Sequence, residues 1–175
     1  MKKQGSLLVA LTAVCVALFA ACVPAPVPTT TTTVAPVDCT VRGDYADLHG
    51  CDLSGADLVG ASLPRANLSG ANLTGADLSG ADLRYANLTN ANLTNATLSG
   101  AIVNEADLTN ANLTNANLAS ANVYYADLTN ADLTDANLFN AYLTGSTLTG
   151  VTWLNTTCPT GIVQDTECPT ESGTG

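Results

Sequence analysis

The chain has 175 residues, of which 46% are hydrophobic and only 5% aromatic, and its formal net charge is −10 at pH 7. This length fits a single domain. A strongly acidic chain repels nucleic acid and anionic lipid surfaces, which carry the same sign of charge, so we exclude both as ligands.

The N-terminal segment at positions 1–21 has the features of an export signal. Lys2 and Lys3 give a positively charged start, and an apolar stretch follows at positions 7–21. That stretch is shorter than the ~20 residues that a membrane-spanning helix needs. We therefore predict a signal peptide over residues 1–21, with a retained N-terminal anchor as the alternative.

The apolar stretch ends in Phe-Ala-Ala-Cys at positions 19–22. Small residues before a cysteine resemble the bacterial lipobox, in which the peptide is cut before the cysteine and the cysteine then carries lipid. Phe19 departs from this pattern, because the lipobox usually has Leu at that position. The resemblance implies lipid attachment, palmitate included, at Cys22. Ordinary cleavage nearby, for example after Ala25, would instead give a secreted protein.

Residues 22–37 contain four prolines and a run of five threonines at 29–33. A Pro/Thr-rich tract cannot bury a core, so we expect an extended, solvated linker.

Removal of the signal also removes both lysines, which leaves three arginines against 15 acidic residues, a net charge of −12. The lipid would hold the exported chain at the extracytoplasmic face of the cell membrane.

From Ala46 to Trp153 the sequence repeats every five residues for 22 consecutive repeats, with no insertion or deletion. Counting from Leu48, 19 of the 22 central positions are Leu, and 19 of the 22 positions two residues earlier are Ala. The other central residues are Val103, Val123 and Trp153. A short fixed period is the signature of a solenoid, and a period of five does not fit an amphipathic helix.

Two segments show the motif clearly: Ala-Asp-Leu-Ser-Gly at 76–80 and Ala-Asn-Leu-Thr-Asn at 91–95. They resemble the pentapeptide-repeat family, A-(D/N)-L-x-x, over 108 of the 175 residues. The resemblance implies an all-β fold, a right-handed quadrilateral parallel β-helix with four repeats per coil and with Leu and Ala pointing inward. The 22 repeats then make about five and a half coils. We place this β-helix and its N-terminal cap at 38–157, and a C-terminal cap and tail at 158–175.

The residues themselves support a coil with tight corners. The position two after the central residue is Gly in nine repeats and Asn in seven, and these residues best tolerate the positive φ of a tight turn. The ends of such a stack expose strand edges that need covers. At the far end the residues expected to form an apolar cover, or alternatively an end-to-end homodimer contact, are Trp153, Leu154, Ile162 and Val163.

Four cysteines flank the repeats, Cys39 and Cys51 at one end and Cys158 and Cys168 at the other. An even number in an exported chain indicates disulfides. Cys51 and Cys158 would lie several coils apart, beyond the ~7 Å Cα separation that a disulfide can span. We therefore predict the pairs Cys39–Cys51 and Cys158–Cys168, each closing one end cap. The same separation excludes a four-cysteine metal site.

With four repeats per coil, positions one coil apart stack, and the bulky departures from the motif gather on one side. We call this side the fourth face: the outward residues around positions 63, 83, 103, 123 and 143. Outward Tyr and Arg are enriched at interfaces, so we predict a protein- or glycan-binding face. The alternative is a structural origin, such as a second turn type that disfavours Gly. The candidate residues are Arg65, Arg84, Tyr85, Ile102, Glu105, Tyr124, Tyr125 and Tyr142.

The other faces carry columns of Thr and Ser beside columns of Asn and Asp. We expect these stacked side chains to hydrogen-bond along the stack; a hydroxyl array that orders water or ice is the alternative. Asp57 should stack on Asp77, and Asp107 on Asp127. Because like carboxylates repel, such pairs are expected to raise a pKa or to attract a cation weakly.

No catalytic motif or phosphate-binding loop occurs, and a solenoid filled with Leu offers no deep cleft. We therefore predict a non-enzymatic protein without cofactor or metal, acting as an interaction or structural module at the cell envelope. The family resemblance implies one rival function, because some pentapeptide-repeat proteins mimic duplex DNA and bind type II topoisomerases, giving quinolone resistance. The export signal and paired cysteines place this chain in the wrong compartment for that role.

Overall fold

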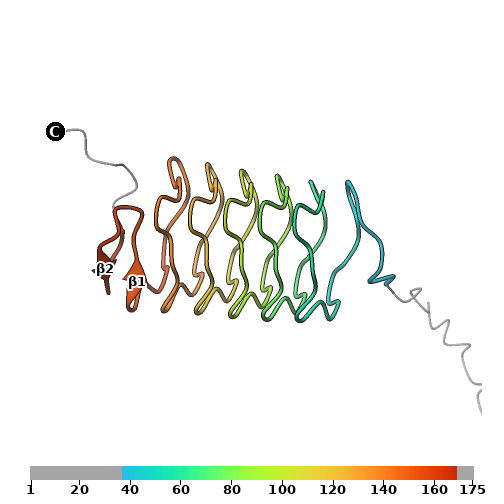
Figure 1. The fold of residues 1–175 in the computed structure, drawn as a ribbon, viewed down its shortest axis with the longest axis horizontal. Helices are drawn as coiled ribbons and strands as arrows, with labels where there is room; N and C mark the ends of the chain where they lie inside the picture. The colour runs from blue at the N-terminus through green and yellow to red at the C-terminus, as the bar shows by residue number, and fades with distance from the viewer. Residues whose placement is uncertain (1–36, 169–175) are drawn as a thin grey trace, which may run out of the picture. The chain divides into compact units, whose positions relative to one another are not determined.

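The computed structural model describes residues 37–168, which lie in one compact unit of the chain. The predicted signal peptide, Cys22, the linker up to residue 36 and the residues from 169 onward lie outside the described part. The described residues form a series of similar coils stacked on one another (Figure 1). Within residues 37–168, no helix is long and apolar enough to cross a membrane.

The coils stack in parallel, with a constant register from one coil to the next. In the described part, 19 isolated parallel bridges join positions that differ by 20 in the sequence, from the pair Asp47–Asn67 to the pair Asn137–Thr157. Two hydrogen bonds form each typical bridge: the Leu68 N–H donates to the Asn87 carbonyl oxygen at 2.7 Å, and the Asn87 N–H donates to the Ala66 carbonyl oxygen at 2.9 Å. One side of a coil is therefore one pentapeptide, and four sides make a coil.

The corners between the sides are tight turns of one kind. After Leu68 the chain turns through Ser69 and Gly70, and the Ala71 N–H donates to the Leu68 carbonyl oxygen at 3.0 Å. Gly70 has a φ of 64°, and every fifth residue from Tyr45 to Asn155 likewise has a positive φ. A turn whose third residue is left-handed favours Gly and Asn at that position, which explains the composition of this column.

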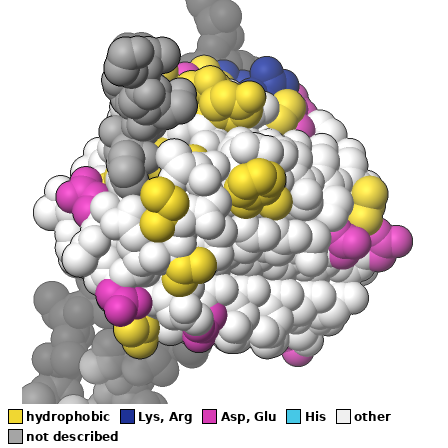
Figure 2. Space-filling view, turned by 60° about the vertical axis from the view of Figure 1, so that its left-hand side comes forward, with side chains coloured by type: hydrophobic (Ala, Val, Ile, Leu, Met, Phe, Trp, Pro, Cys, Tyr) yellow, Lys and Arg dark blue, Asp and Glu magenta, His cyan; other side chains and the backbone are white. Residues whose placement is uncertain are grey.

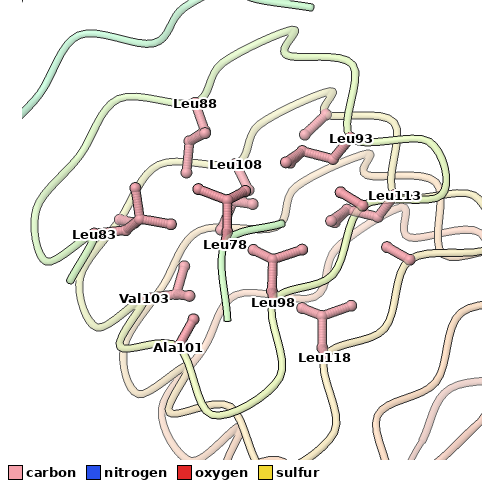
Figure 3. Close-up of a cluster of buried hydrophobic side chains, with 14 of the residues drawn as sticks. Leu78, Leu83, Leu88, Leu93, Leu98, Ala101, Val103, Leu108, Leu113 and Leu118 are labelled. Atoms are coloured by element: carbon pink, nitrogen blue, oxygen red, sulfur yellow. The ribbon is translucent and has the colours of Figure 1, made fainter. Parts of the chain in front are cut away.

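The interior of the stack is filled by the central residue of each repeat and by the small residue two positions earlier. Leu78, Leu98 and Val103 are fully buried, as are their neighbours in the same columns. Figure 3 shows these side chains projecting from all sides of the coil toward its centre. A fully buried Leu contributes ~1.5–3 kcal/mol, so the Leu columns dominate the stability of the stack.

Disulfides lie beside both ends of the repeat segment. One joins Cys39 to Cys51 with a Cα separation of 5.6 Å, and the other joins Cys158 to Cys168 with a Cα separation of 5.4 Å. They are the two pairs that the sequence analysis expects. An antiparallel hairpin is formed by β1 (Thr156–Thr157) and β2 (Val163–Gln164), and the second disulfide joins Cys158, directly after β1, to Cys168, four residues after β2.

The apolar cover expected at the C-terminal end is wrong for three of its four residues. Trp153 is buried, but Leu154, Ile162 and Val163 are 54%, 59% and 54% exposed. The inward places at this end are taken instead by Trp153, Thr156 and the paired cysteines. Thr156 is fully buried, and its hydroxyl is satisfied there by donating to the Leu133 carbonyl oxygen at 2.7 Å. The aliphatic side chains of the hairpin are therefore left outside.

Candidate binding face

The fourth face consists of three outward columns that run parallel to the axis of the stack. One column precedes the central residues and is joined from coil to coil by the parallel bridges Ser62–Asp82–Ile102–Asn122–Tyr142. A second column follows the central residues, and a third stands at the corner. The corner column contains, in order, Tyr45, Arg65, Tyr85, Glu105, Tyr125 and Gly145.

The corner residues of the fourth face have the same left-handed backbone as the Gly and Asn corners elsewhere. The φ angles are 59° at Arg65, 62° at Tyr85, 56° at Glu105 and 56° at Tyr125, compared with 58° at Asn95. The alternative explanation, that a second turn type disfavours Gly at the corners of this face, is therefore wrong. The left-handed conformation costs a residue with a bulky side chain ~1–2 kcal/mol, so these four residues occupy positions that their backbone disfavours.

An arginine lies between two tyrosines in the first half of the corner column. The guanidinium carbon of Arg65 is 5.6 Å from the ring centroid of Tyr45 and 4.8 Å from that of Tyr85. A cation over an exposed aromatic ring contributes ~0.5–1 kcal/mol. Tyr45 is not among the residues expected on this face, although it precedes Arg65 by one full coil and that interval is the signal that places it there.

Arg84, beside this column, binds a carboxylate of its own repeat. Its Nε donates to Oδ1 of Asp82 at 2.9 Å, and its Nη2 donates to Oδ2 at 2.6 Å. The hydrogen bond from Arg84 lowers the pKa of Asp82, and the same contact raises the pKa of Arg84. Because the two charges cancel locally, Arg84 offers little positive charge to a partner.

Three tyrosines lie together in the second half of the fourth face, and we call them the tyrosine patch: Tyr124, Tyr125 and Tyr142. The rings of Tyr124 and Tyr142 are stacked, with centroids 5.6 Å apart and planes inclined by 24°. The Tyr125 ring lies over Gly145, where a Cβ atom would come within 2.4 Å of two ring carbons. Tyr125 and Tyr142 remain 68% and 52% exposed, whereas Tyr124 is half-buried.

The structure thus divides the candidate residues into two groups. Arg65, Arg84 and Tyr85 belong to the first, and the tyrosine patch is the second. Ile102 and Glu105 lie between them, Ile102 half-buried and Glu105 exposed at the corner. The part played by Gly145 was not expected from the sequence. Its signal was a single glycine in a corner column otherwise made of large residues.

A family model for pentapeptide repeats matches the chain with 8 copies, over residues 44–80, 76–115 and 111–150. The chain belongs to the pentapeptide-repeat family. Proteins of this family fold as right-handed quadrilateral β-helices, and the four-sided coil with its constant register has that architecture.

Several solved pentapeptide-repeat structures are similar to this chain. Rfr23 from the cyanobacterium Cyanothece 51142 is 35% identical, with 60% of this chain and 85% of that chain covered and a TM-score of 0.45. A protein from the Arabidopsis thaliana thylakoid lumen is 33% identical, with 64% and 66% covered and a TM-score of 0.29. Trypsin-treated QnrB1, a plasmid-mediated fluoroquinolone resistance protein, is 20% identical, with 66% and 71% covered and a TM-score of 0.46. Comparison with curated proteins gives no match.

The polar columns on the other faces of the pentapeptide-repeat coil bond mainly within each repeat. Oδ1 of Asn72 accepts from the Thr74 N–H at 3.2 Å and from the Thr74 hydroxyl at 2.7 Å, and many repeats share this arrangement. Side-chain contacts between coils are fewer; in one, the Asn72 amide donates to Asp52 at 3.0 Å. The expectation that stacked side chains hydrogen-bond along the stack is therefore confirmed at a few positions. At most positions the residue two places on in the same repeat is the partner instead, because it is nearer.

Stacked carboxylates do not raise the pKa of Asp77, contrary to expectation. Asp57 and Asp77 are joined by a backbone bridge, as are Asp107 and Asp127. However, the Ser79 hydroxyl, and then the Ser79 backbone N–H, donate to Asp77 and lower its pKa. Within residues 37–168 no group of three or more His, Cys, Asp or Glu side chains is arranged to hold a metal ion.

Proposed function

We propose that this protein is an exported, lipid-anchored and non-enzymatic binding module at the cell envelope. Its stack of about five and a half coils would present the fourth face to an envelope protein or glycan. Three features support the proposal: the export-type N-terminus, the lipobox-like segment ending at Cys22, and two disulfides, which persist in oxidising compartments. The linker up to residue 37 would separate the anchor from the binding face.

One observation carries the assignment of the fourth face. Tyr85 and Tyr125 stand exposed at left-handed corners where the fold alone favours Gly or Asn. The contact of Tyr85 with Arg65 contributes ~0.5–1 kcal/mol, less than the ~1–2 kcal/mol cost of a left-handed backbone. The exposed rings are therefore best explained by contact with something outside the fold. Aromatic and arginine side chains are the types that contribute most at binding interfaces.

The binding role is tested by crosslinking and pull-down from native envelope, with the parent protein and a variant in which the exposed tyrosines are replaced. The replacements follow the residues of the other faces: Tyr85→Asn, Tyr125→Asn, Tyr124→Thr and Tyr142→Asn. A partner captured only by the parent supports the fourth face as the binding site. Equal capture by both proteins would move the site to another surface, and no capture by either would leave a passive spacer.

The lipid anchor is tested separately. The parent should sediment with membranes and carry a lipid-modified N-terminal peptide in mass spectrometry. Cys22→Ser should abolish the modification and release the protein. An uncleaved parent in the cytosol would contradict export and would favour the DNA-mimic function instead.

The C-terminal end also supports pairing with a second copy. Leu154, Ile162 and Val163 are exposed there, and the N–H groups of Leu148 and Trp153 have no acceptor among residues 37–168. Figure 2, with this end turned forward, shows hydrophobic side chains as separate spots on a mainly uncharged polar surface. Open strand edges are templates for pairing.

An end-to-end dimer predicts that sedimentation shows a monomer–dimer equilibrium. The change Ile162→Asp with Val163→Asp should shift it to monomer. Val59→Asp is the matched control, since Val59 is equally exposed, at 59%, but belongs to the first coil. A parent that stays monomeric at every concentration would contradict the dimer.

A further inference from the structure

The tyrosine patch is an uncharged surface on a strongly acidic chain. Its neighbours in the outward columns are Asn104, Asn122, Thr144 and, one coil before Tyr125 in the corner column, the exposed Glu105. The chain as a whole carries a net charge of −10. The charges nearest along the face belong to Glu105 and to the mutually neutralised pair Asp82–Arg84. The tyrosines themselves carry no charge, and the Glu105 carboxylate beside them repels anions but can accept hydrogen bonds from hydroxyl groups. The chemistry of the patch therefore favours a neutral ligand rich in hydroxyl groups.

The side chains of the patch supply both contacts that a sugar ring requires. The Tyr125 ring lies over Gly145, and because the residue is 68% exposed, much of the ring surface is accessible to solvent. Stacked on Tyr124, Tyr142 is also more than half exposed. The C–H groups of a pyranose can pack on such apolar rings, whose hydroxyls remain available as donors and acceptors. Amide and hydroxyl groups, here those of Asn122 and Thr144, can bind sugar hydroxyls.

The arrangement extends along the axis of the stack. Tyr85 precedes Tyr125 by two coils in the same corner column and is 46% exposed. With coils ~4.8 Å apart, the two side chains are spaced by about 10 Å along the axis. This is close to the length of one disaccharide in an extended β-1,4-linked glycan. One ring face of Tyr85 contacts Arg65, so the remaining exposed surface of the residue, with its hydroxyl, is what it can offer to a ligand.

From these features we infer that the fourth face binds a neutral polysaccharide with an extended, β-1,4-linked backbone. The glycan runs along the stack, packs a pyranose on the tyrosine patch and reaches Tyr85 one disaccharide further on. This inference rests on the proposed function, in which the fourth face is a binding surface, and it names the chemistry of the ligand.

The test is affinity electrophoresis of the full chain, in detergent, through gels containing hydroxyethylcellulose or glycol chitin. Dextran is the control polymer because its α-1,6 linkages do not give an extended ribbon. We expect retardation by the β-1,4-linked polymers and not by dextran. The change Tyr124→Thr, Tyr125→Asn and Tyr142→Asn should weaken binding at least about ten-fold, equivalent to ~1.4 kcal/mol. Tyr85→Asn should weaken binding to cellohexaose while leaving binding to cellobiose unchanged.

Phe139→Thr is the matched control, because Phe139 is an aromatic residue 46% exposed on a different face. Circular dichroism and thermal unfolding of each variant show that the fold is kept. Absence of retardation of the parent by any β-1,4-linked polymer overturns the inference, as does equal retardation of parent and patch variant. If a protein is captured from envelope through the tyrosines while no glycan binds, the fourth face remains a binding surface but not for sugar. If neither occurs, the proposed function fails as well.

Discussion

Arg65, Tyr85, Glu105 and Tyr125 occupy a backbone position that Gly or Asn fills on most other corners of the coil. Two of them gain something locally: Arg65 and Tyr85 contact each other, and Arg65 also contacts Tyr45. Tyr125 covers Gly145. Glu105 has neither kind of contact among the described residues, so its left-handed backbone is without an evident compensation.

Glu105→Asn should therefore stabilise the protein, by about 1 kcal/mol, because Asn tolerates the left-handed conformation better than Glu. Urea unfolding followed by circular dichroism measures the change. Asn95→Glu, at an equivalent corner of another face, should destabilise by a similar amount and serves as the reverse control. A loss of stability in Glu105→Asn would show that the Glu105 side chain makes a stabilising contact.

The aspartates in the polar columns predict how stability depends on pH. Hydrogen bonds from Ser79 lower the pKa of Asp77, and hydrogen bonds from Ser54 similarly lower that of Asp52. A carboxyl whose pKa is lower in the folded than in the unfolded state stabilises the fold above the unfolded pKa of ~3.9. That contribution is lost as the pH falls through the lowered folded pKa. The melting temperature should therefore change little between pH 7 and pH 5 and fall below about pH 4.

Asp77→Asn isolates one such site, because the Asn side chain keeps the acceptor oxygen but does not titrate. Its melting temperature at pH 7 should stay close to that of the parent, and its loss on acidification should be smaller. Asn92→Asp is the converse: Asn92 accepts from the Thr94 N–H and hydroxyl in the same geometry, so the variant should lose more on acidification. Identical pH profiles for all three proteins would show that these carboxyls do not control acid stability.

At the scale of the element, each side of a coil is a single bridge between pentapeptides, and only β1 and β2 form strands within the described residues. No side can persist without the coils above and below it. Internal and terminal coils should therefore respond differently to the loss of a core residue. Leu98 is fully buried with coils on both sides, whereas Leu148 is only half-buried in the last coil.

Leu98→Ala should destabilise the protein by about 2–5 kcal/mol, because it removes a buried side chain and leaves a cavity in a rigid stack. Leu148→Ala should cost clearly less, because part of that side chain already faces solvent. Chemical denaturation of both variants gives the comparison. Equal losses at the two positions would indicate that the last coil is as well covered as the middle of the stack.

The hairpin at the C-terminal end depends on its disulfide. Apart from its contact with the last coil, the hairpin has two paired residues on each strand and two exposed aliphatic side chains, those of Ile162 and Val163. Cys158→Ser with Cys168→Ser should therefore reduce stability by about 2–4 kcal/mol. Amide exchange should accelerate first around residues 153–164 and leave the amide of Leu98 protected. Uniform acceleration along the stack would contradict a local role for this disulfide.

The sequence predicts the coil far better than its ends. The central Leu and the preceding Ala recur without a break, so a single structural assumption places them all inside, and nearly all are buried. The C-terminal hairpin does not repeat, so no recurring pattern indicates which of its residues face inward. There, hydrophobicity predicted that Leu154, Ile162 and Val163 would be buried. In the structure, Thr156 and two cysteines are buried instead, because of the local hairpin geometry.

The fourth face was predictable as a set of residues but not as a set of contacts. The interval of one coil, or four pentapeptides, identifies its columns, because side chains in one column must stack. Which neighbour a long side chain contacts depends on its rotamer and on which of several nearby partners binds it most strongly. Arg84 binds Asp82 rather than Tyr85, and Tyr124 stacks diagonally on Tyr142. Periodicity carries no information about either choice.

At the scale of the molecule, charge and aromatic content are distributed unequally around the stack. Among residues 37–168, two of the three arginines and all five tyrosines belong to the fourth face. The other faces are built largely from Asn, Asp, Thr and Ser that bond within their own repeats. One side of an otherwise uniform solenoid thus holds nearly all of the side chains that distinguish it.

Because every coil holds 20 residues in constant register, the position of a residue within its block of 20 determines the direction of its side chain. Deleting one pentapeptide, for example residues 106–110, would keep each Leu and Ala facing inward, yet it would rotate everything downstream by a quarter turn. Tyr85 and the tyrosine patch would then point to adjacent sides of a coil whose core is unchanged. Deleting four pentapeptides would restore the alignment. Removing any whole number of pentapeptides therefore preserves the inward residues, but only removing a multiple of four preserves the alignment of the outward faces.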